Sequence, residues 1–171
     1  MPKSDQGIEQ KRYQVVPRTL IFLFDDKTRV LLIKGSPQKK LWAGLYNGIG
    51  GHIEKGEDVL EAAYRELFEE TGITNVSLSL CGQIMIDVSE TVGVSNFIFR
   101  GTFTTNNFEP SSEGSLTWIP MGALADYPVV EDLPRLIPLV AAYPKKEDFI
   151  IGKYAYSLGG KLMMNFHDTV S

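Results

Sequence analysis

Three glutamates fall within about one turn of a predicted helix and could hold a metal ion. Glu66, Glu69 and Glu70 are three and four positions apart. This spacing makes helical side chains neighbours, and like charges so placed repel unless a cation is present. Magnesium prefers oxygen ligands, keeps several waters and is usually completed by substrate phosphates. The pattern therefore indicates metal-assisted chemistry on a phosphate anhydride, whereas a solvated acidic helix face is the alternative.

A glycine-rich stretch before this helix could bring backbone close to the carboxylates. Residues 42–51 read WAGLYNGIGG. Glycine lets the chain approach a ligand closely, but it is also common in plain turns. Because the acidic helix begins only a few residues later, we favour a binding loop.

The helix that carries the glutamates is predicted over residues 58–71. Asp58 and Glu61 have the spacing of a capping box, and Gly72 suits the left-handed residue that follows a helix end. At about 100° per residue, the apolar side chains gather on one face, opposite the glutamates. The apolar set is Leu60, Ala63, Tyr64, Leu67 and Phe68. The helix is therefore predicted to be amphipathic.

Patterns elsewhere predict an α/β fold, with a mixed sheet covered by helices. Apolar runs rich in β-branched residues, separated by turn residues, indicate three hairpins and a short apolar segment. The hairpin strands are 14–24 with 29–34, 76–88 with 94–104, and 149–157 with 161–166; the short segment is 116–120, followed by a turn at 121–124. A second helix is expected over 133–142, before Pro144, and residues 1–13 are expected to be a flexible N-terminus.

Length and composition limit the number of domains, the partners and the compartment that can be expected. A length of 171 residues suits one domain, and a net charge of −4 argues against a nucleic-acid polymer as partner, because nucleic-acid-binding surfaces are usually basic. The lone Cys81 fits a reducing compartment, and the sequence has neither an apolar run of about 18 residues nor a signal-peptide pattern. We therefore expect a single cytoplasmic domain, monomeric or homodimeric, that binds no membrane.

Residues 51–73 resemble the signature of the Nudix hydrolase family. That signature is a glycine, five residues, a glutamate, seven residues and then R-E-U-x-E-E-x-G-U, where U is apolar. Every fixed position is matched, by Gly51, Glu57, Arg65, Glu66, Leu67, Glu69, Glu70, Gly72 and Ile73. The resemblance implies an α/β/α sandwich with a mixed sheet. It also implies hydrolysis of a nucleoside diphosphate linked to another moiety, with Mg²⁺ or Mn²⁺ as cofactor.

The resemblance further implies that the three helix glutamates bind metal and that the backbone carbonyl of Gly50 joins them. Because Glu66 and Glu70 are four apart, they are our first choices for direct ligands, with Glu69 a third ligand or a water-holding base. Arg65 is predicted to orient a neighbouring carboxylate through a fork of hydrogen bonds, or else to be a surface ion pair. Glu69, Glu70 and Arg65 are thus the catalytic candidates in the helix.

Three segments outside the signature resemble the MutT-like branch of the family, which hydrolyses purine nucleoside triphosphates, oxidised ones included. Residues 45–51 are similar to W-N-G-x-G-G, in which the asparagine, here Asn47, contacts the base. Glu113 precedes Trp118 by five residues, as does a further metal-binding or catalytic carboxylate in that branch. Residues 127–132 resemble W-P-acid-acid, whose acids read the purine, but here two residues intervene and tyrosine replaces tryptophan.

The chemistry of an oxidised purine is also compatible with recognition by these residues. Oxidation at C8 turns the N7 acceptor of guanine into a donor, and two adjacent acids that share a proton, Glu131 and Asp132, could detect the change. Tyr127 is a candidate for stacking on the base and Lys34 for contacting phosphate. Each candidate has a plainer alternative, namely a turn residue for Asn47, a helix cap for the acids and a solvated strand end for Lys34.

We therefore predict a metal-dependent pyrophosphohydrolase of a purine nucleoside triphosphate, with an oxidised purine as the favoured substrate. Its products would be the nucleoside monophosphate and pyrophosphate. ADP-ribose, a dinucleoside polyphosphate or a nucleotide sugar are alternative substrates. A non-catalytic nucleotide-binding module is the alternative from outside the enzymes.

Overall fold

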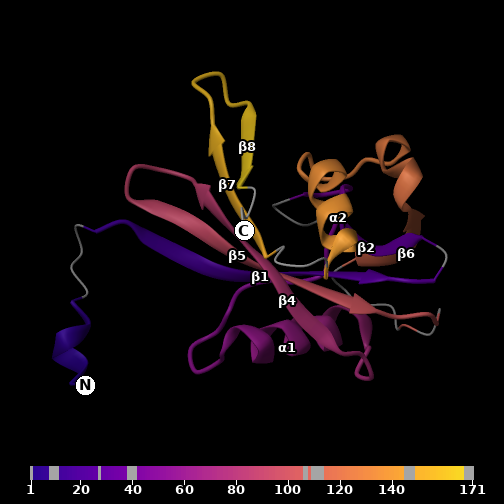
Figure 1. Cartoon of the computed structure of the whole chain (residues 1–171), viewed down its shortest axis with the longest axis horizontal. Helices are drawn as coiled ribbons and strands as arrows, with labels where there is room; N and C mark the ends of the chain where they lie inside the picture. The colour runs from indigo at the N-terminus through magenta and orange to yellow at the C-terminus, as the bar shows by residue number, and fades with distance from the viewer. Residues whose placement is uncertain are drawn as a thin grey trace.

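Eight strands form one mixed sheet within the described part of this computed structural model, residues 2–7, 12–26, 28–37, 42–105, 108, 114–144 and 149–167. The strands are β1 (Gln14–Phe24), β2 (Arg29–Gly35), β3 (Tyr46–Asn47), β4 (Leu78–Asp87), β5 (Val92–Thr102), β6 (Gly114–Pro120), β7 (Ile150–Tyr156) and β8 (Leu162–His167). Helix α1 (Val59–Thr71) covers one face and α2 (Leu133–Ala142) the other (Figure 1). The predicted α/β/α sandwich with a mixed sheet is confirmed.

The strands follow the order β3-β2-β1-β5-β4-β7-β8, and β6 also pairs with β2. The three predicted hairpins, β1–β2, β4–β5 and β7–β8, are all present and antiparallel. Two parallel pairings join them, β1 with β5 and β4 with β7. Hairpin patterns are local and cannot reveal such pairings, because parallel neighbours need a long crossover connection.

The central parts of β1 and β2 are buried on both faces, as their continuous apolar runs predict. Leu20, Phe22 and Phe24 belong to the core on the α2 side of the sheet. Ile21 and Leu23 belong to the core on the α1 side. Because successive strand residues point to opposite faces, β1 supplies side chains to both cores.

Both predicted ends of α1 are confirmed. The Asp58 side chain accepts hydrogen bonds from the backbone N–H groups of Leu60 and Glu61, and the Glu61 side chain accepts one from the Asp58 N–H. Gly72 follows the helix with a φ of 70°, the left-handed conformation that glycine adopts without steric cost. Local sequence therefore determines where α1 begins and ends.

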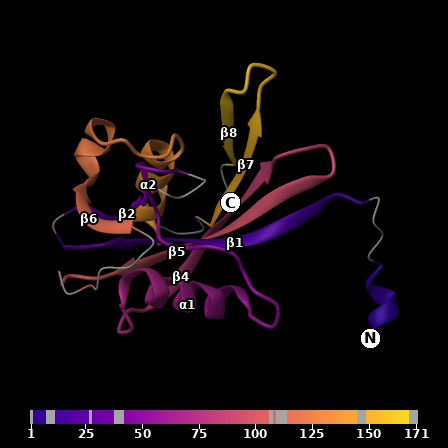
Figure 2. The ribbon, with the colours of Figure 1, turned by 180° about the vertical axis from the view of Figure 1, so that it is seen from behind.

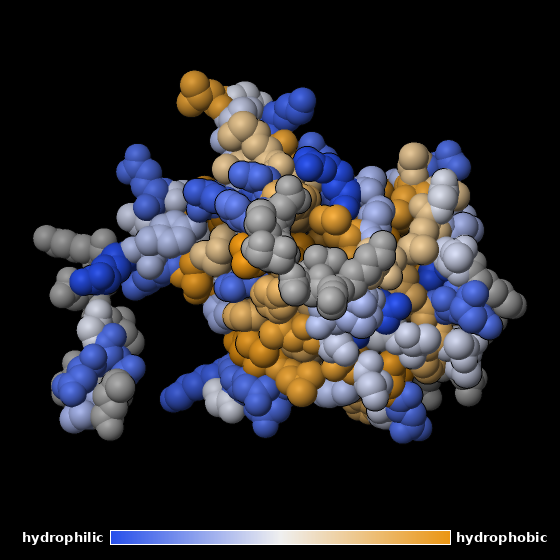
Figure 3. All heavy atoms as spheres, in the orientation of Figure 1, coloured by the Kyte–Doolittle hydropathy of each residue, from blue (hydrophilic) through white to orange (hydrophobic). Residues whose placement is uncertain are grey.

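The predicted amphipathic face of α1 is wrong. The helix buries the side that carries Ala63, Leu67 and Glu70, whereas Leu60, Tyr64 and Phe68 are exposed, Phe68 by 58%. Apolar side chains accordingly gather on the surface over α1 (Figure 3). Periodicity weighs only apolarity, and it cannot foresee that a backbone donor on another segment would offset the burial of a glutamate.

Several short elements also differ from the expectations. Residues predicted as loop form β3, the turn predicted at 121–124 is part of a 3-10 helix, η2 (Met121–Asp126), and a further 3-10 helix, η1 (Lys3–Gln6), lies in the expected flexible N-terminus. This last element stands apart from the sheet in both views (Figures 1 and 2). Such short segments contain too few residues to show a period. No described helix has the length and apolarity needed to cross a membrane.

Candidate metal and nucleotide site

The glycine-rich segment runs along β1 and faces α1. The Thr19 N–H donates to the Gly51 carbonyl at 2.9 Å, and Ile21 exchanges two hydrogen bonds with Ile49. Gly50 lies between these contacts with a φ of 142°, and a Cβ there would collide with the Thr19 carbonyl. Only glycine suits this position, because other residues rarely adopt a positive φ and would not fit against β1. The tight approach holds Gly50 beside the helix glutamates.

Glu70 is the buried acid of the site, with only 5% of its surface exposed. Its Oε2 accepts a hydrogen bond from the Gly50 N–H at 3.0 Å. A buried carboxylate is costly unless it is hydrogen-bonded, and this bond across 20 residues of sequence supplies one such partner. Glu70 is thereby fixed against the backbone of the glycine segment.

Arg65 gathers the other acids of the signature. Its guanidinium donates through Nε and Nη2 to the two carboxylate oxygens of Glu57, at 2.6 and 3.0 Å. Through Nη1 it donates to Glu66 at 2.7 Å and to Glu69 at 3.1 Å, and Nη2 also donates to the His52 carbonyl. The bond with Arg65 lowers the pKa of Glu57, and a backbone bond from Glu54 lowers it further. The same carboxylate raises the pKa of Arg65.

The acidic side chains offer oxygen donors of the kind that magnesium binds. The Glu66 carboxylate lies so close to Gly51 that a Cβ there would be 2.5 Å from Glu66 Oε1. In the described residues, no three acidic, histidine or cysteine side chains converge on one point, and Arg65 contacts both Glu66 and Glu69. The type of donor fits a divalent ion, but the carboxylates would have to move to converge on it. Glu113, the other predicted ligand, lies outside the described residues.

The predicted base-binding segment lies at strand β3. Asn47 pairs with Ile33 of β2, and its neighbour Tyr46 exchanges backbone hydrogen bonds with the 128–130 segment, at 2.8 and 3.0 Å. The Asn47 side chain accepts a hydrogen bond from the Gly48 N–H at 2.8 Å, as a turn asparagine would. Its carboxamide is therefore held at the end of β3.

Tyr46 brings two of the predicted substrate residues together, and sequence reasoning missed it. Its ring packs edge-on against the Tyr127 ring, with centroids 5.8 Å apart. The Lys34 ammonium lies 5.5 Å from the centroid of the same ring. Lys34 and Tyr127 are thus grouped around one aromatic side chain, whereas Asn47, the next residue of β3, points to the opposite face of the sheet. The available signal was the aromatic residue directly before Asn47, which occupies the tryptophan position of the W-N-G pattern.

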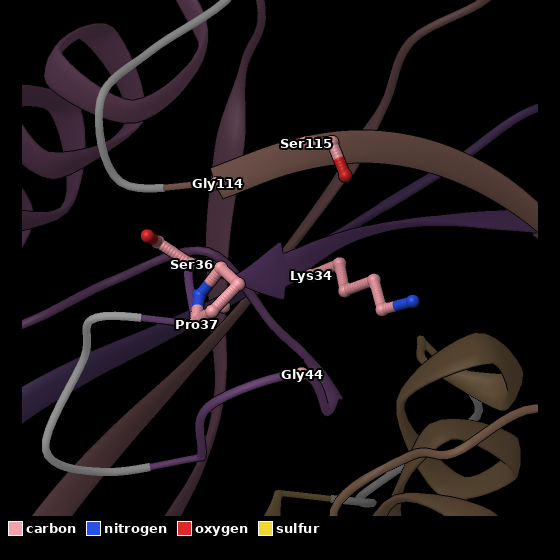
Figure 4. Close-up of a pocket in the computed structure, with 7 residues that line it drawn as sticks. Lys34, Ser36, Pro37, Gly44, Gly114 and Ser115 are labelled. Atoms are coloured by element: carbon pink, nitrogen blue, oxygen red, sulfur yellow. The ribbon is translucent and has the colours of Figure 1, made fainter.

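A shallow cavity of about 410 Å³ adjoins this group, between the end of β2 and the start of β6 (Figure 4). Its lining consists of Lys34, Gly35, Ser36, Pro37, Gly44, Gly114 and Ser115. Gly114 directly follows Glu113 in the sequence, but Glu113 lies outside the described residues.

The two acidic residues before α2 differ in solvent exposure. Glu131 is exposed, whereas Asp132 is half-buried. Asp132 occupies the N-cap position, but its side chain makes no cap hydrogen bond. Burial raises the pKa of Asp132, and the Glu131 charge adds to the rise. The Asp132 side chain therefore does not cap α2, and base recognition by the pair stays a prediction.

Known proteins resemble this chain in sequence. A family model described as the NUDIX domain matches residues 15–140. The oxidized purine nucleoside triphosphate hydrolase of Danio rerio is 41% identical over 73 residues, 42% of this chain and 46% of that relative. The RNA pyrophosphohydrolase of Rhizobium meliloti is 59% identical over 44 residues, 26% of this chain and 23% of that relative. The chain thus spans less than half the length of these curated relatives.

Solved structures show the same fold. The MutT protein of Bacillus halodurans superposes with a TM-score of 0.70 at 22% identity, covering 89% of this chain and 97% of that protein. Likeness at this level of identity concerns the fold alone.

Proposed function

This chain belongs to the NUDIX family, and on that premise we propose that it is a metal-dependent pyrophosphohydrolase of purine nucleoside triphosphates, oxidised purines included. The observation that carries the proposal is the pairing of the α1 glutamates with the glycine segment, in which Gly50 binds Glu70 and Gly51 lies against Glu66. The earlier resemblance to the family is confirmed. The substrate and the roles of individual residues are parts of the proposal.

The residues that would hold Mg²⁺ or Mn²⁺ are Glu66, Glu69, Glu70 and the Gly50 carbonyl, with Glu113 as a further candidate. When bound, the ion would polarise the phosphate oxygens and neutralise charge that develops on the leaving group. Glu70 is fixed by the Gly50 N–H, so one carboxylate is oriented before any ligand arrives. Preorganised groups of this kind cost no rearrangement during reaction.

Glu69 is the acid most free to change partners. Its side chain is 55% exposed, and its contact with Arg65 is longer than that of Glu66, 3.1 Å against 2.7 Å. Arg65 is anchored on the other side by both oxygens of Glu57. Release of Glu69 would therefore leave Arg65 in place and supply a carboxylate that binds metal or accepts a proton from the attacking water.

We assign recognition of a purine to Asn47, Tyr127 and Asp132, of which Tyr127 packs against Tyr46. Asn47 offers a carboxamide, which can donate and accept hydrogen bonds, and Tyr127 offers an aromatic face. Asp132 is half-buried with a raised pKa, so its proton could follow the change of N7 from acceptor to donor. The relatives from Danio rerio and Mus musculus named as oxidized purine nucleoside triphosphate hydrolases support this choice.

A second candidate substrate is RNA, favoured by relatives named RNA pyrophosphohydrolase, one of them 59% identical over 44 residues. The net charge of −4 weighs against this candidate. ADP-ribose, dinucleoside polyphosphates and nucleotide sugars remain alternatives. A cytoplasmic location and a monomeric or homodimeric state stay predictions.

The test is a panel of these nucleotides assayed with magnesium and with product identification, for the wild-type protein and Glu70→Gln. A glutamine oxygen can still accept from the Gly50 N–H, so the fold should persist while the negative charge is lost. We expect turnover to fall by about 10- to 100-fold. Glu90→Gln, an exposed acid in the β4–β5 turn, is the matched control and should behave as wild type.

Two results would count against the proposal. Turnover by Glu70→Gln at the wild-type rate, with an unchanged magnesium requirement, would remove the metal-site assignment. Failure of the wild-type protein to hydrolyse any member of the panel, combined with measurable nucleotide binding, would favour a non-catalytic module instead.

A further inference from the structure

The cavity at the end of β2, which we call the Lys34 cavity, contains a lysine without an acidic partner. Lys34 lines this space of about 410 Å³ and is half-buried (Figure 4). Among the described residues it forms no ion pair, and its ammonium lies 5.5 Å from the centroid of the Tyr46 ring. An aromatic ring attracts a cation but does not neutralise its charge. The cavity therefore offers an uncompensated positive charge to an anionic ligand.

The Lys34 side chain lies on the side of the sheet away from the α1 glutamates. Leu32, two residues earlier in β2, belongs to the α2-side core, and Tyr46, which pairs with Lys34, packs against that core. Strand residues two apart point to the same face, so Lys34 is on the α2 side. Helix α1, with Glu66 and Glu70, covers the opposite face (Figure 1). An anion at Lys34 is thus on the other side of the sheet from the proposed metal.

Backbone contacts form the walls of the Lys34 cavity. The Gly44 N–H donates to the Gly35 carbonyl at 3.0 Å, and Gly35 pairs with Gly114 across β2 and β6. A Cβ at Gly114 would collide with the Lys34 carbonyl, and one at Gly35 would be 2.6 Å from the Trp42 carbonyl oxygen. Because the colliding atoms belong to the backbone, larger residues would not fit at either glycine. The walls are therefore in place without a ligand.

The donors in the cavity suit a phosphate group. Ser115, an exposed residue of β6, pairs directly with Lys34 of β2, so both side chains lie on one face of the sheet. The ammonium offers three N–H donors and the hydroxyl one, and lysine binds phosphate as a point charge. The volume exceeds that of a phosphate alone and lies within the range of about 300 to 1,000 Å³ for small-molecule sites. The ligand should therefore carry an organic group, which Pro37 and the glycine backbone would contact.

We propose that the Lys34 cavity is a second anion site, which binds a phosphate monoester without a metal ion. Lys34 supplies the charge that neutralises the phosphate, and Ser115 donates a hydrogen bond to it. The earlier prediction that Lys34 contacts phosphate is retained, but this phosphate is not the one that the α1 glutamates hold through a metal. The inference does not rest on the proposed function, because no residue of the metal site takes part.

The experiment is an NMR titration of the whole chain in EDTA, with ribose 5-phosphate as the probe. The backbone amides of Gly35, Gly44 and Ser115, which line the cavity, report on binding there. EDTA removes divalent ions, so the α1 glutamates are left as bare carboxylates that repel a phosphate. We expect ribose 5-phosphate to shift the three amides to saturation, inorganic phosphate to do so at higher concentration, and uncharged ribose to leave them unchanged.

Two variants assign the binding to its donors. Lys34→Met should weaken the affinity for ribose 5-phosphate by about 10- to 100-fold, since a charge-assisted hydrogen bond is lost. Ser115→Ala should weaken it by about threefold to tenfold, because a neutral hydrogen bond is lost. Methionine keeps an unbranched stem beside the Tyr46 ring, and the unfolding temperature verifies that each variant is folded. Lys161→Met, which removes one positive charge from an exposed position before β8, is the matched control and should bind as wild type.

Several results would overturn the proposal. One is the absence of a saturable shift at the three amides, and another is equal affinity of Lys34→Met and wild type. Tighter binding of inorganic phosphate than of ribose 5-phosphate would refute the assignment to a monoester. Binding that appears only with magnesium and is lost in Glu70→Gln would place the phosphate at the metal site instead. Because this titration uses no turnover, its failure leaves the proposed function intact, and failure of the nucleotide panel leaves the Lys34 cavity intact.

Discussion

Replacing Gly51 by alanine should disable the proposed metal site without unfolding the protein. Gly51 has no positive φ, so its backbone tolerates a side chain. The new Cβ, however, would be 2.5 Å from Glu66 Oε1 and 2.7 Å from its Cδ and Oε2. Because the carboxylate is the far end of a flexible side chain, Glu66 should move and the backbone should stay.

The size of the effect follows from these distances. An ordinary contact of a Cβ begins near 3.4 Å, so the Glu66 carboxylate must move by about 0.9 Å, and misplacement by about 1 Å can cost about 100-fold in rate. The move also breaks the 2.7 Å ion pair with Arg65. A partly exposed ion pair contributes about 1 kcal/mol or less, which corresponds to about 2 to 4 °C in the unfolding temperature.

Three measurements test the prediction: kcat with a purine nucleoside triphosphate, the Mn²⁺ dissociation constant by calorimetry, and the unfolding temperature. Gly122→Ala is the matched control, since it too has no positive φ and a Cβ there would meet nothing within 4 Å. We expect Gly51→Ala to lose about 100-fold in rate and 10- to 100-fold in metal affinity. Metal affinity and rate within twofold of wild type would refute the placement of Glu66 in the metal site.

Two other predictions follow from the same structure. Asn47→Ala should lower kcat/KM for an oxidised purine about tenfold more than for the unmodified purine, since one base-specific hydrogen bond is lost; equal losses would remove Asn47 from base recognition. Burial raises the pKa of the Cys81 thiol to about 12, above that of an unfolded thiol. The contribution of the protonated Cys81 thiol to the free energy of unfolding is therefore complete below about pH 8.5. It is lost between about pH 8.5 and about pH 12, by at most about 1.4 kcal/mol per pH unit. Urea unfolding at pH 7.5 and 10 should accordingly show a smaller loss of stability in Cys81→Ala than in wild type, and an identical loss would contradict this linkage.

The sequence alone determined the features that depend on neighbours along the chain. The capping box of Asp58 and Glu61, the Gly72 terminus and the three hairpins all follow from spacings of a few residues, and the structure confirms them. The family resemblance was equally local, because the signature lies within 23 consecutive positions, residues 51–73. Short-range geometry constrains such patterns directly.

Only the tertiary structure decided which groups face each other across the sheet. It turned the Glu70 side of α1 inwards, because the Gly50 N–H on a separate segment binds that carboxylate. It also grouped Lys34 and Tyr127 around Tyr46. These pairings depend on how strands and helices pack. The hydrophobic periodicity of the sequence cannot predict these pairings, because a contact between remote residues exists only once the chain between them has folded.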